Sequence, residues 1–161
     1  AKLFVDVDGV VLRRTGRIEF RGRTEFEVAH HAEEFLLWAT ASFECYWLTA
    51  RSHQGDIEEV ARAFRLAVGF TDDLGALVRS IPAARWGATK VDGIVLAEEF
   101  RWLDDNPDAA SLAVLERHGL LDRLIEVSTD RWPDDLVRVR ELLERLSRSF
   151  EVLRPSPRPP I

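Results

Sequence analysis

Cysteine is almost missing from this sequence of 161 residues, in which Cys45 is the only example. A lone cysteine cannot form an internal disulfide. Its rarity is consistent with a reducing compartment, and we expect a cytoplasmic protein. Because Cys45 lies among apolar residues with no activating base nearby, we interpret it as a small buried hydrophobe rather than a nucleophile.

Long apolar runs are missing as well. No segment approaches the roughly 18 consecutive apolar residues of a membrane-spanning helix, so we expect no membrane partner. The chain enters its first predicted strand at residue 2, and we therefore expect no signal peptide. An apolar fraction of 46% and a charged fraction of 31% are typical of a soluble globular protein.

Lysine is rare, and acidic residues outnumber basic ones by 28 to 22. Of the 22 basic residues only Lys2 and Lys90 are lysines, and the formal charge of −6 argues against a general nucleic-acid-binding protein. Residues 12–23 are an exception, because they carry five arginines against the single acid Glu19. The five are Arg13, Arg14, Arg17, Arg21 and Arg23. Two interpretations stay open: they balance an acidic surface, or they attract a polyanionic substrate.

Apolar runs of strand length alternate along the chain with segments of helical periodicity. The predicted strands are residues 2–7, 43–48, 66–68, 100–103 and 124–127, and the predicted helices are residues 26–40, 56–64, 89–99, 108–118 and 133–146. This alternation predicts an α/β fold of three layers, Rossmann-like, with a parallel five-stranded sheet and helices on both faces. We expect one domain at residues 1–150, followed by an extended proline-rich tail at residues 151–161.

The stretch from Leu3 to Val10 is an apolar run that ends in two carboxylates, Asp6 and Asp8, followed at once by Gly9. Functional sites of open α/β sheets lie just outside the carboxyl ends of the strands. Two anions in one pocket repel each other unless a cation or a shared proton compensates. The alternative is an ordinary polar turn after a buried strand.

Polar groups of complementary type follow other predicted strands. Thr49 ends the second strand, Asp104 and Asp105 end the fourth, and Lys90 opens the helix that leads into the fourth. Carboxylates that meet at one sheet edge need a divalent cation, and an all-oxygen site suits Mg²⁺. A hydroxyl and an ammonium group beside that site would bind phosphoryl oxygens.

Four segments in this order, FVDVDGV, WLTAR, ATKVDGI and RWLDDN, resemble the motifs of the haloacid dehalogenase (HAD) superfamily, in its phosphatase branch. The resemblance spans residues 3–106. It implies that Asp6 is the nucleophile that forms an aspartyl-phosphate and that Asp8 is the general acid and base. It also implies that the Thr49 hydroxyl binds the phosphoryl group and that Lys90 stabilises the transition state.

The same resemblance implies a set of metal ligands. Asp6, the backbone carbonyl of Asp8, and Asp104 would hold Mg²⁺, and Asp105 would be a further ligand or would hold a metal-bound water. Several assignments have a structural alternative. Thr49 is suited to capping the turn that follows it, Lys90 to a solvated helix surface, and Asp105 to capping the next helix.

The predicted site has little to enclose it. Members of the HAD superfamily select substrates with cap domains, but here the first gap holds only a hairpin, predicted at residues 10–21 with its tip at Thr15 and Gly16. We expect this hairpin to project over the site as a flap. Arg13, Arg17 and Arg51 are candidate substrate contacts, with solvated surface positions as the alternative.

The function predicted from these residues is a Mg²⁺-dependent phosphate monoester hydrolase without a cap, acting on a phosphorylated and possibly macromolecular substrate. One alternative is a polynucleotide 3′- or 5′-end-processing phosphatase, which the acidic net charge does not favour. A second, from another class, is a catalytically silent binding or regulatory module with the same fold. The oligomeric state and the physiological substrate are not predicted.

Overall fold

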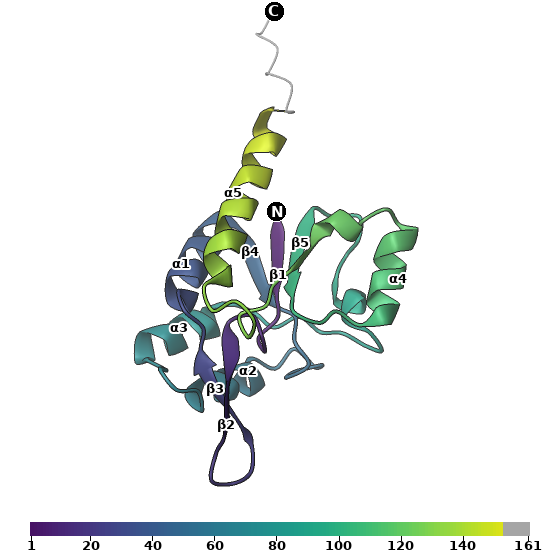
Figure 1. The fold of residues 1–161 in the computed structure, drawn as a ribbon. Helices are drawn as coiled ribbons and strands as arrows, with labels where there is room; N and C mark the ends of the chain where they lie inside the picture. The colour runs from purple at the N-terminus through teal and green to yellow at the C-terminus, as the bar shows by residue number, and fades with distance from the viewer. Residues whose placement is uncertain (153–161) are drawn as a thin grey trace, which may run out of the picture.

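The central element is a parallel sheet of four strands, seen in a computed structural model that describes residues 1–152 (Figure 1). The strands are β1 (Lys2–Val5), β4 (Glu44–Trp47), β5 (Phe100–Asp104) and β6 (Leu124–Glu126). Their order across the sheet is β4-β1-β5-β6, and every neighbouring pair is parallel. Apolar runs such as LFV in β1 form these strands because a parallel strand between two helical layers is buried on both faces.

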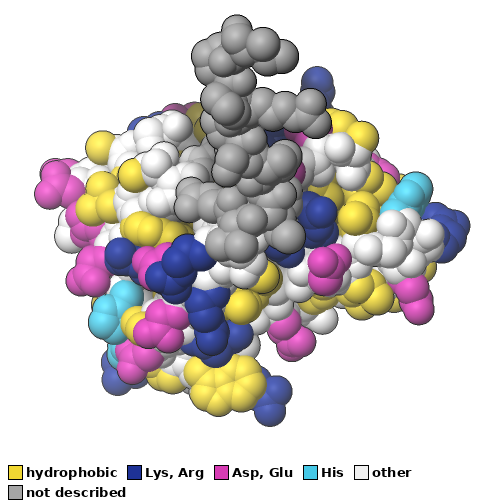
Figure 2. Space-filling model, turned by 90° about the horizontal axis from the view of Figure 1, so that it is seen from above, with side chains coloured by type: hydrophobic (Ala, Val, Ile, Leu, Met, Phe, Trp, Pro, Cys, Tyr) yellow, Lys and Arg dark blue, Asp and Glu magenta, His cyan; other side chains and the backbone are white. Residues whose placement is uncertain are grey.

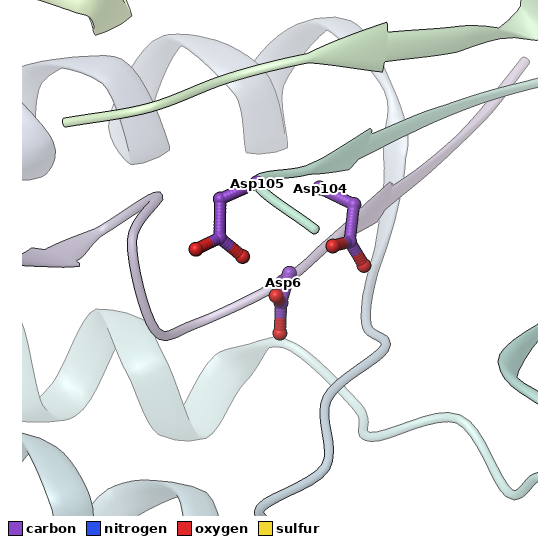
Figure 3. Close-up of side chains that lie close together, drawn as sticks. All are labelled: Asp6, Asp104 and Asp105. Atoms are coloured by element: carbon purple, nitrogen blue, oxygen red, sulfur yellow. The ribbon is translucent and has the colours of Figure 1, made fainter. Parts of the chain in front are cut away.

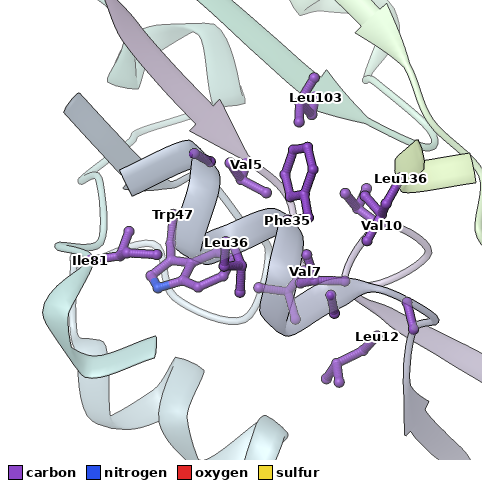
Figure 4. Close-up of a cluster of buried hydrophobic side chains, with 14 of the residues drawn as sticks. Val5, Val7, Val10, Leu12, Phe35, Leu36, Trp47, Ile81, Leu103 and Leu136 are labelled. Carbon is purple, nitrogen blue, oxygen red and sulfur yellow. The ribbon is translucent and has the colours of Figure 1, made fainter. Parts of the chain in front are cut away.

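Helices cover both faces of the sheet, which confirms the predicted three-layer α/β architecture. One face carries α1 (Ala32–Ser42), α2 (Ile57–Arg65), α3 (Asp72–Ser80) and α5 (Asp135–Val152), and the other carries α4 (Ala109–Arg117) with the 3₁₀ turns η1 (Lys90–Gly93) and η2 (Leu121–Arg123). The alternation of β1 divides the core accordingly. Val5 packs with Phe35 and Leu36 of α1 (Figure 4), whereas Phe4 packs with Phe100 and Leu115 on the other side.

The strand predicted at residues 66–68 is wrong, so the central sheet of the described chain has four strands and not the predicted five. Residues 66–68 do not join the central sheet, and Val68 instead makes an isolated bridge with Glu27. The outer edge of β4 pairs only through a second isolated bridge, between Trp47 and Ala83. Val68 is 53% exposed and Leu66 is 68% exposed, so this segment lacks the two buried faces that an inner parallel strand requires.

The helix predicted at residues 89–99 is also wrong. The chain makes only the short turn η1 there, and Gly93 ends it. A Cβ on Gly93 would lie 3.1 Å from the carbonyl oxygen of Arg85, so this glycine allows a close backbone approach that a continued helix would not need. The helix predicted from residue 26 begins only at Ala32, because Phe26 and Val28 also fit the period of two of a strand.

A hairpin of β2 (Leu12–Ile18) and β3 (Thr24–Val28) follows the first strand. It is longer than predicted, and its tip lies at residues 19–23 rather than at Thr15 and Gly16. The tip is closed by the Glu19 N–H, which donates to the Arg23 carbonyl at 2.8 Å. Gly16, at φ +82°, lies instead in the irregular stretch of β2 where the pairing register shifts.

The remaining predicted segments correspond to observed elements within a few residues, and α5 extends to Val152, beyond the predicted 146. The proline-rich tail lies outside the described residues from 153 onward. Among residues 1–152, no helix is long and apolar enough to span a membrane. Seen from above, Lys and Arg side chains lie among Asp and Glu side chains, so this face carries charges of both signs (Figure 2).

Candidate functional site

The strand order fixes where a site is expected in this sheet. After β1 the chain adds β4 on one side of β1, and later β5 on the other side. The connections therefore diverge between β1 and β5, and ligands of open α/β sheets bind at the carboxyl ends of such strands. Asp6 directly follows β1, and Asp104 ends β5, so two acidic residues face each other at this point.

Three carboxylates converge there. Asp6, Asp104 and Asp105 each offer one oxygen, and these oxygens lie within 4.8 Å of one another (Figure 3). Asp6 is 5% exposed and Asp104 is fully buried, while Asp105 is half-buried. Such crowding of buried anions is unfavourable unless positive charge is supplied.

Gly9 makes the approach of Asp105 possible. A Cβ added at Gly9 would lie 2.1 Å from Oδ2 of Asp105, and Gly9 has a φ of +75°. Both the space and the left-handed backbone therefore require glycine. The turn after β1 and the position of the third carboxylate thus depend on the same residue.

Lys90 supplies one positive charge to the cluster. Its Nζ donates to Oδ2 of Asp104 at 2.7 Å and lies 3.2 Å from Oδ2 of Asp6. The turn η1 that carries Lys90 is anchored by the Val91 N–H, which donates to Oγ of Ser111 in α4 at 3.0 Å. Burial opposes the charge of Lys90 most strongly, but the charges of Asp6 and Asp104 outweigh it and raise the pKa of the ammonium group.

Two carboxyl groups of the cluster have raised pKa values. Burial and then the charge of Asp104 raise the pKa of Asp6 well above its ordinary value, although Lys90 opposes the shift. Burial and Asp104 likewise raise the pKa of Asp105. Three carboxylates and one ammonium leave a formal charge of −2, which matches one divalent cation. All the candidate ligands are hard oxygen atoms. Such a set suits Mg²⁺ and does not suit a metal that prefers thiolate or imidazole ligands.

Thr49 reaches the same edge from the next strand. The register that pairs Val5 with Trp47 places Thr49 beside the chain that leaves β1. Thr49 is buried, and its hydroxyl accepts a hydrogen bond from the Arg51 N–H at 3.1 Å. Its carbonyl accepts from Nε1 of Trp86 at 3.1 Å, so the turn after β4 is held in place. The Thr49 hydroxyl therefore caps the turn, as the structural alternative expected. This cap is compatible with the phosphate-binding role predicted for the same hydroxyl.

Asp8 is turned away from the carboxylate cluster. Its two carboxylate oxygens accept hydrogen bonds from the guanidinium of Arg51. Nε of Arg51 lies 3.1 Å from Oδ1 and 3.0 Å from Oδ2, and Nη2 lies 3.0 Å from Oδ1. The metal role expected for Asp8 rests on its backbone carbonyl and stays a prediction. Asp8 and Arg51 carry opposite charges and follow the adjacent strands β1 and β4, but this ion pair was not among the predicted contacts.

The arginines of the hairpin are mostly paired. Arg13 forms an ion pair with Glu27, and its Nε donates to the Thr129 carbonyl at 3.1 Å. Arg14 pairs with Asp130, and Arg17 is exposed. Of the three candidate substrate contacts, only Arg51 therefore touches another predicted site residue, and the roles of Arg13 and Arg17 stay predictions.

The arrangement combines a buried carboxylate nucleophile candidate, a second carboxylate two residues later, a hydroxyl, an ammonium group and a ligand set for a hard divalent cation. These are the groups that transfer of a phosphoryl group requires. Comparison of the chain with models of protein families, with curated proteins and with solved structures finds no match.

Proposed function

We propose that this chain is a Mg²⁺-dependent phosphate monoester hydrolase of the HAD type. The observation that carries the proposal is the buried cluster of Asp6, Asp104 and Asp105, bridged by Lys90 at the carboxyl edge of the sheet. A binding module has no need to bury Asp6 and Asp104 beside the half-buried Asp105 when only one lysine offsets their charges, because that arrangement costs stability. A divalent cation held there would neutralise the cluster and would offer its own charge to the oxygens of a phosphate ester.

The proposed first half-reaction uses the two aspartates that follow β1 in different roles. An oxygen of Asp6 attacks phosphorus, a new O–P bond forms, and the bond from phosphorus to the leaving oxygen breaks. Asp8 donates a proton to that leaving oxygen. Lys90 and the Thr49 hydroxyl bind the equatorial phosphoryl oxygens, where negative charge accumulates. Asp6, Asp104, Asp105 and the Asp8 carbonyl would hold Mg²⁺, which would supply further neutralisation of that charge when bound.

The second half-reaction releases the product. Asp8, now deprotonated, accepts a proton from water as the water oxygen attacks phosphorus. The O–P bond to Asp6 breaks, which releases inorganic phosphate and regenerates the free carboxylate of Asp6. The overall reaction consumes one water and converts a phosphate monoester into an alcohol and inorganic phosphate.

The surroundings of the site bear on the class of substrate. Between Gly9 and α1 the chain forms only the hairpin, which leaves the sheet from its carboxyl edge (Figure 1), so a large phosphorylated substrate has access. Polynucleotide end-processing is the second candidate, because of the five arginines at residues 13–23. It is less favoured, since Arg13, Arg14 and Arg23 already pair with acids of this chain.

The test is hydrolysis of 4-nitrophenyl phosphate by the purified chain. Activity should require Mg²⁺, disappear with a chelator, and be abolished by Asp6→Asn, which removes the nucleophile but keeps the size of the side chain. Asp122→Asn, the same change at an exposed position in the turn η2 before β6, is the matched control. Full activity of Asp6→Asn would refute the mechanism, and inactivity of the unmodified chain across aryl, peptide and oligonucleotide phosphates would favour the silent module.

A further inference from the structure

Arg51 connects three parts of the molecule. Its backbone N–H donates to the Thr49 hydroxyl, and its guanidinium donates to both carboxylate oxygens of Asp8. The same guanidinium lies over the ring of Phe26 on the hairpin, with Cζ 5.0 Å from the ring centroid. Arg51 therefore contacts the turn after β4 through its backbone, and the second aspartate of the site and the hairpin through its side chain.

The ion pair between Arg51 and Asp8 is incompatible with the proposed task of Asp8. A general acid must lie within about 2.6–3.2 Å of the atom that it protonates. Here both carboxylate oxygens face Arg51, outside the cluster of Asp6, Asp104 and Asp105. For Asp8 to serve a leaving group, Arg51 has to release it.

Substrate chemistry offers a cause for that release. A phosphate monoester carries up to two negative charges and presents several oxygens to the planar fork of a guanidinium, whereas Asp8 carries one charge. Arg51 lies two residues beyond Thr49, whose hydroxyl is the predicted phosphoryl contact. The side chains of Arg51 and Asp8 are 34% and 27% exposed, so water and ligand reach the pair.

We propose that Arg51 exchanges partners when the substrate binds: it pairs with Asp8 in the free protein and transfers to the phosphoryl group, which frees Asp8 for proton transfer. This inference rests on the proposed phosphatase function and adds a substrate-binding residue to it. Arg51 thereby links occupation of the site to the availability of the acid. The ring of Phe26 supports the guanidinium from the hairpin side.

The exchange predicts a competition that can be measured with inorganic phosphate. Asp8 and phosphate compete for the same guanidinium, so Asp8→Asn should tighten phosphate binding while it slows turnover. We expect a gain of roughly 2- to 5-fold, the worth of a partly exposed ion pair. Arg51→Gln should weaken phosphate binding by about 10- to 100-fold, the usual range for losing a charge-assisted hydrogen bond.

The experiment is a double-mutant cycle on the full chain, with the dissociation constant of inorganic phosphate measured by calorimetry in the presence of Mg²⁺. Asp8→Asn should tighten phosphate more in the native background than in the Arg51→Gln background. Arg51→Lys should restore part of the affinity, because it keeps the charge but not the fork. Thermal melts of each variant verify that it is folded.

Arg14 provides the matched control, because its guanidinium lies over the same Phe26 ring at 5.4 Å but pairs with Asp130 instead of a site residue. Arg14→Gln should change phosphate affinity far less than Arg51→Gln, because Arg14 acts on Asp8 and Asp105 only through its charge and makes no hydrogen bond to either. Equal tightening by Asp8→Asn in both backgrounds would mean simple relief of repulsion and would overturn the exchange. Absence of phosphate binding by folded Asp8→Asn protein would overturn it too. Intact coupling without hydrolysis of any ester would count against the proposed function alone.

Discussion

Replacing Lys90 by methionine tests the charge balance of the site directly. Lys90→Met keeps most of the volume of the side chain but removes the one ammonium group that bridges Asp6 and Asp104. Breaking a buried ion pair on one side costs about 3–5 kcal/mol. For a chain of this length, 1 kcal/mol corresponds to roughly 2–4 °C of melting temperature, so the metal-free variant should melt about 6–20 °C lower.

Magnesium should offset the loss. A ligand at 100 times its dissociation constant stabilises the folded state by about 2.7 kcal/mol. Removing Lys90 changes the formal charge of the cluster from −2 to −3. A divalent cation should therefore bind the variant more tightly and raise its melting temperature by more than it raises that of the native chain.

The loss of stability caused by Lys90→Met should also depend on pH, and the direction of that dependence follows from the pKa of Asp6. The pKa of Asp6 is raised in the folded state, so its protonated form is favoured by folding, and metal-free stability falls as pH rises through that raised pKa. Lys90 opposes this shift. Its removal should therefore cost most on the alkaline side of the raised pKa and less on the acidic side.

The assay is thermal denaturation followed by circular dichroism, with a chelator or with increasing Mg²⁺, at several pH values. Lys2→Met is the matched control, because Lys2 is the other lysine of the chain and pairs with Glu98 at a partly exposed position. It should change neither the melting temperature nor the response to Mg²⁺ appreciably. Equal Mg²⁺ responses in native and Lys90→Met protein would refute the charge argument.

Three further predictions concern other residues. Asp8→Asn should slow hydrolysis of an alkyl phosphate by roughly 10²–10⁴-fold and of 4-nitrophenyl phosphate by less, as comparison of kcat for the two esters will show. Gly9→Ala should displace Asp105 and weaken Mg²⁺ binding more than Gly16→Ala, whose added Cβ meets no atom within 4 Å, in a calorimetric titration. Burial raises the pKa of Cys45 to about 12, so its reaction with a thiol reagent at pH 8 should be slow until denaturant unfolds the chain.

The sequence sufficed for those parts of the fold that depend on local patterns. The apolar runs that end at Asp6 and Asp104 belong to β1 and β5, whose direct pairing brings the two acids together. Parallel sheets bury such runs completely, which makes them easy to recognise without knowledge of the strand order. The alternation of strands with helices then predicts the three layers.

The predictions from the sequence were wrong or incomplete in two situations. In one, a short segment fits both the helical and the strand period; in the other, the structure of a segment depends on partners far away in the sequence. Phe26 and Val28 satisfy both helical and strand spacing, and their pairing with β2 made them a strand. Gly16 lies in a bulge because the tip formed elsewhere, around Gly22. The pairing of Arg51 with Asp8 joins residues 43 positions apart, and local sequence carries little information about such a contact.

Gly9 sets a sequence condition for the proposed Mg²⁺ site that the acidic residues alone do not reveal. Any side chain at this position would collide with Asp105, even when Asp6, Asp104 and Asp105 are all retained. A homologous chain with the three acids but without this glycine would therefore keep the acidic residues and lose the geometry of the proposed Mg²⁺ site. Under the proposed function, loss of activity could thus begin with a single backbone position, before any acidic residue changes.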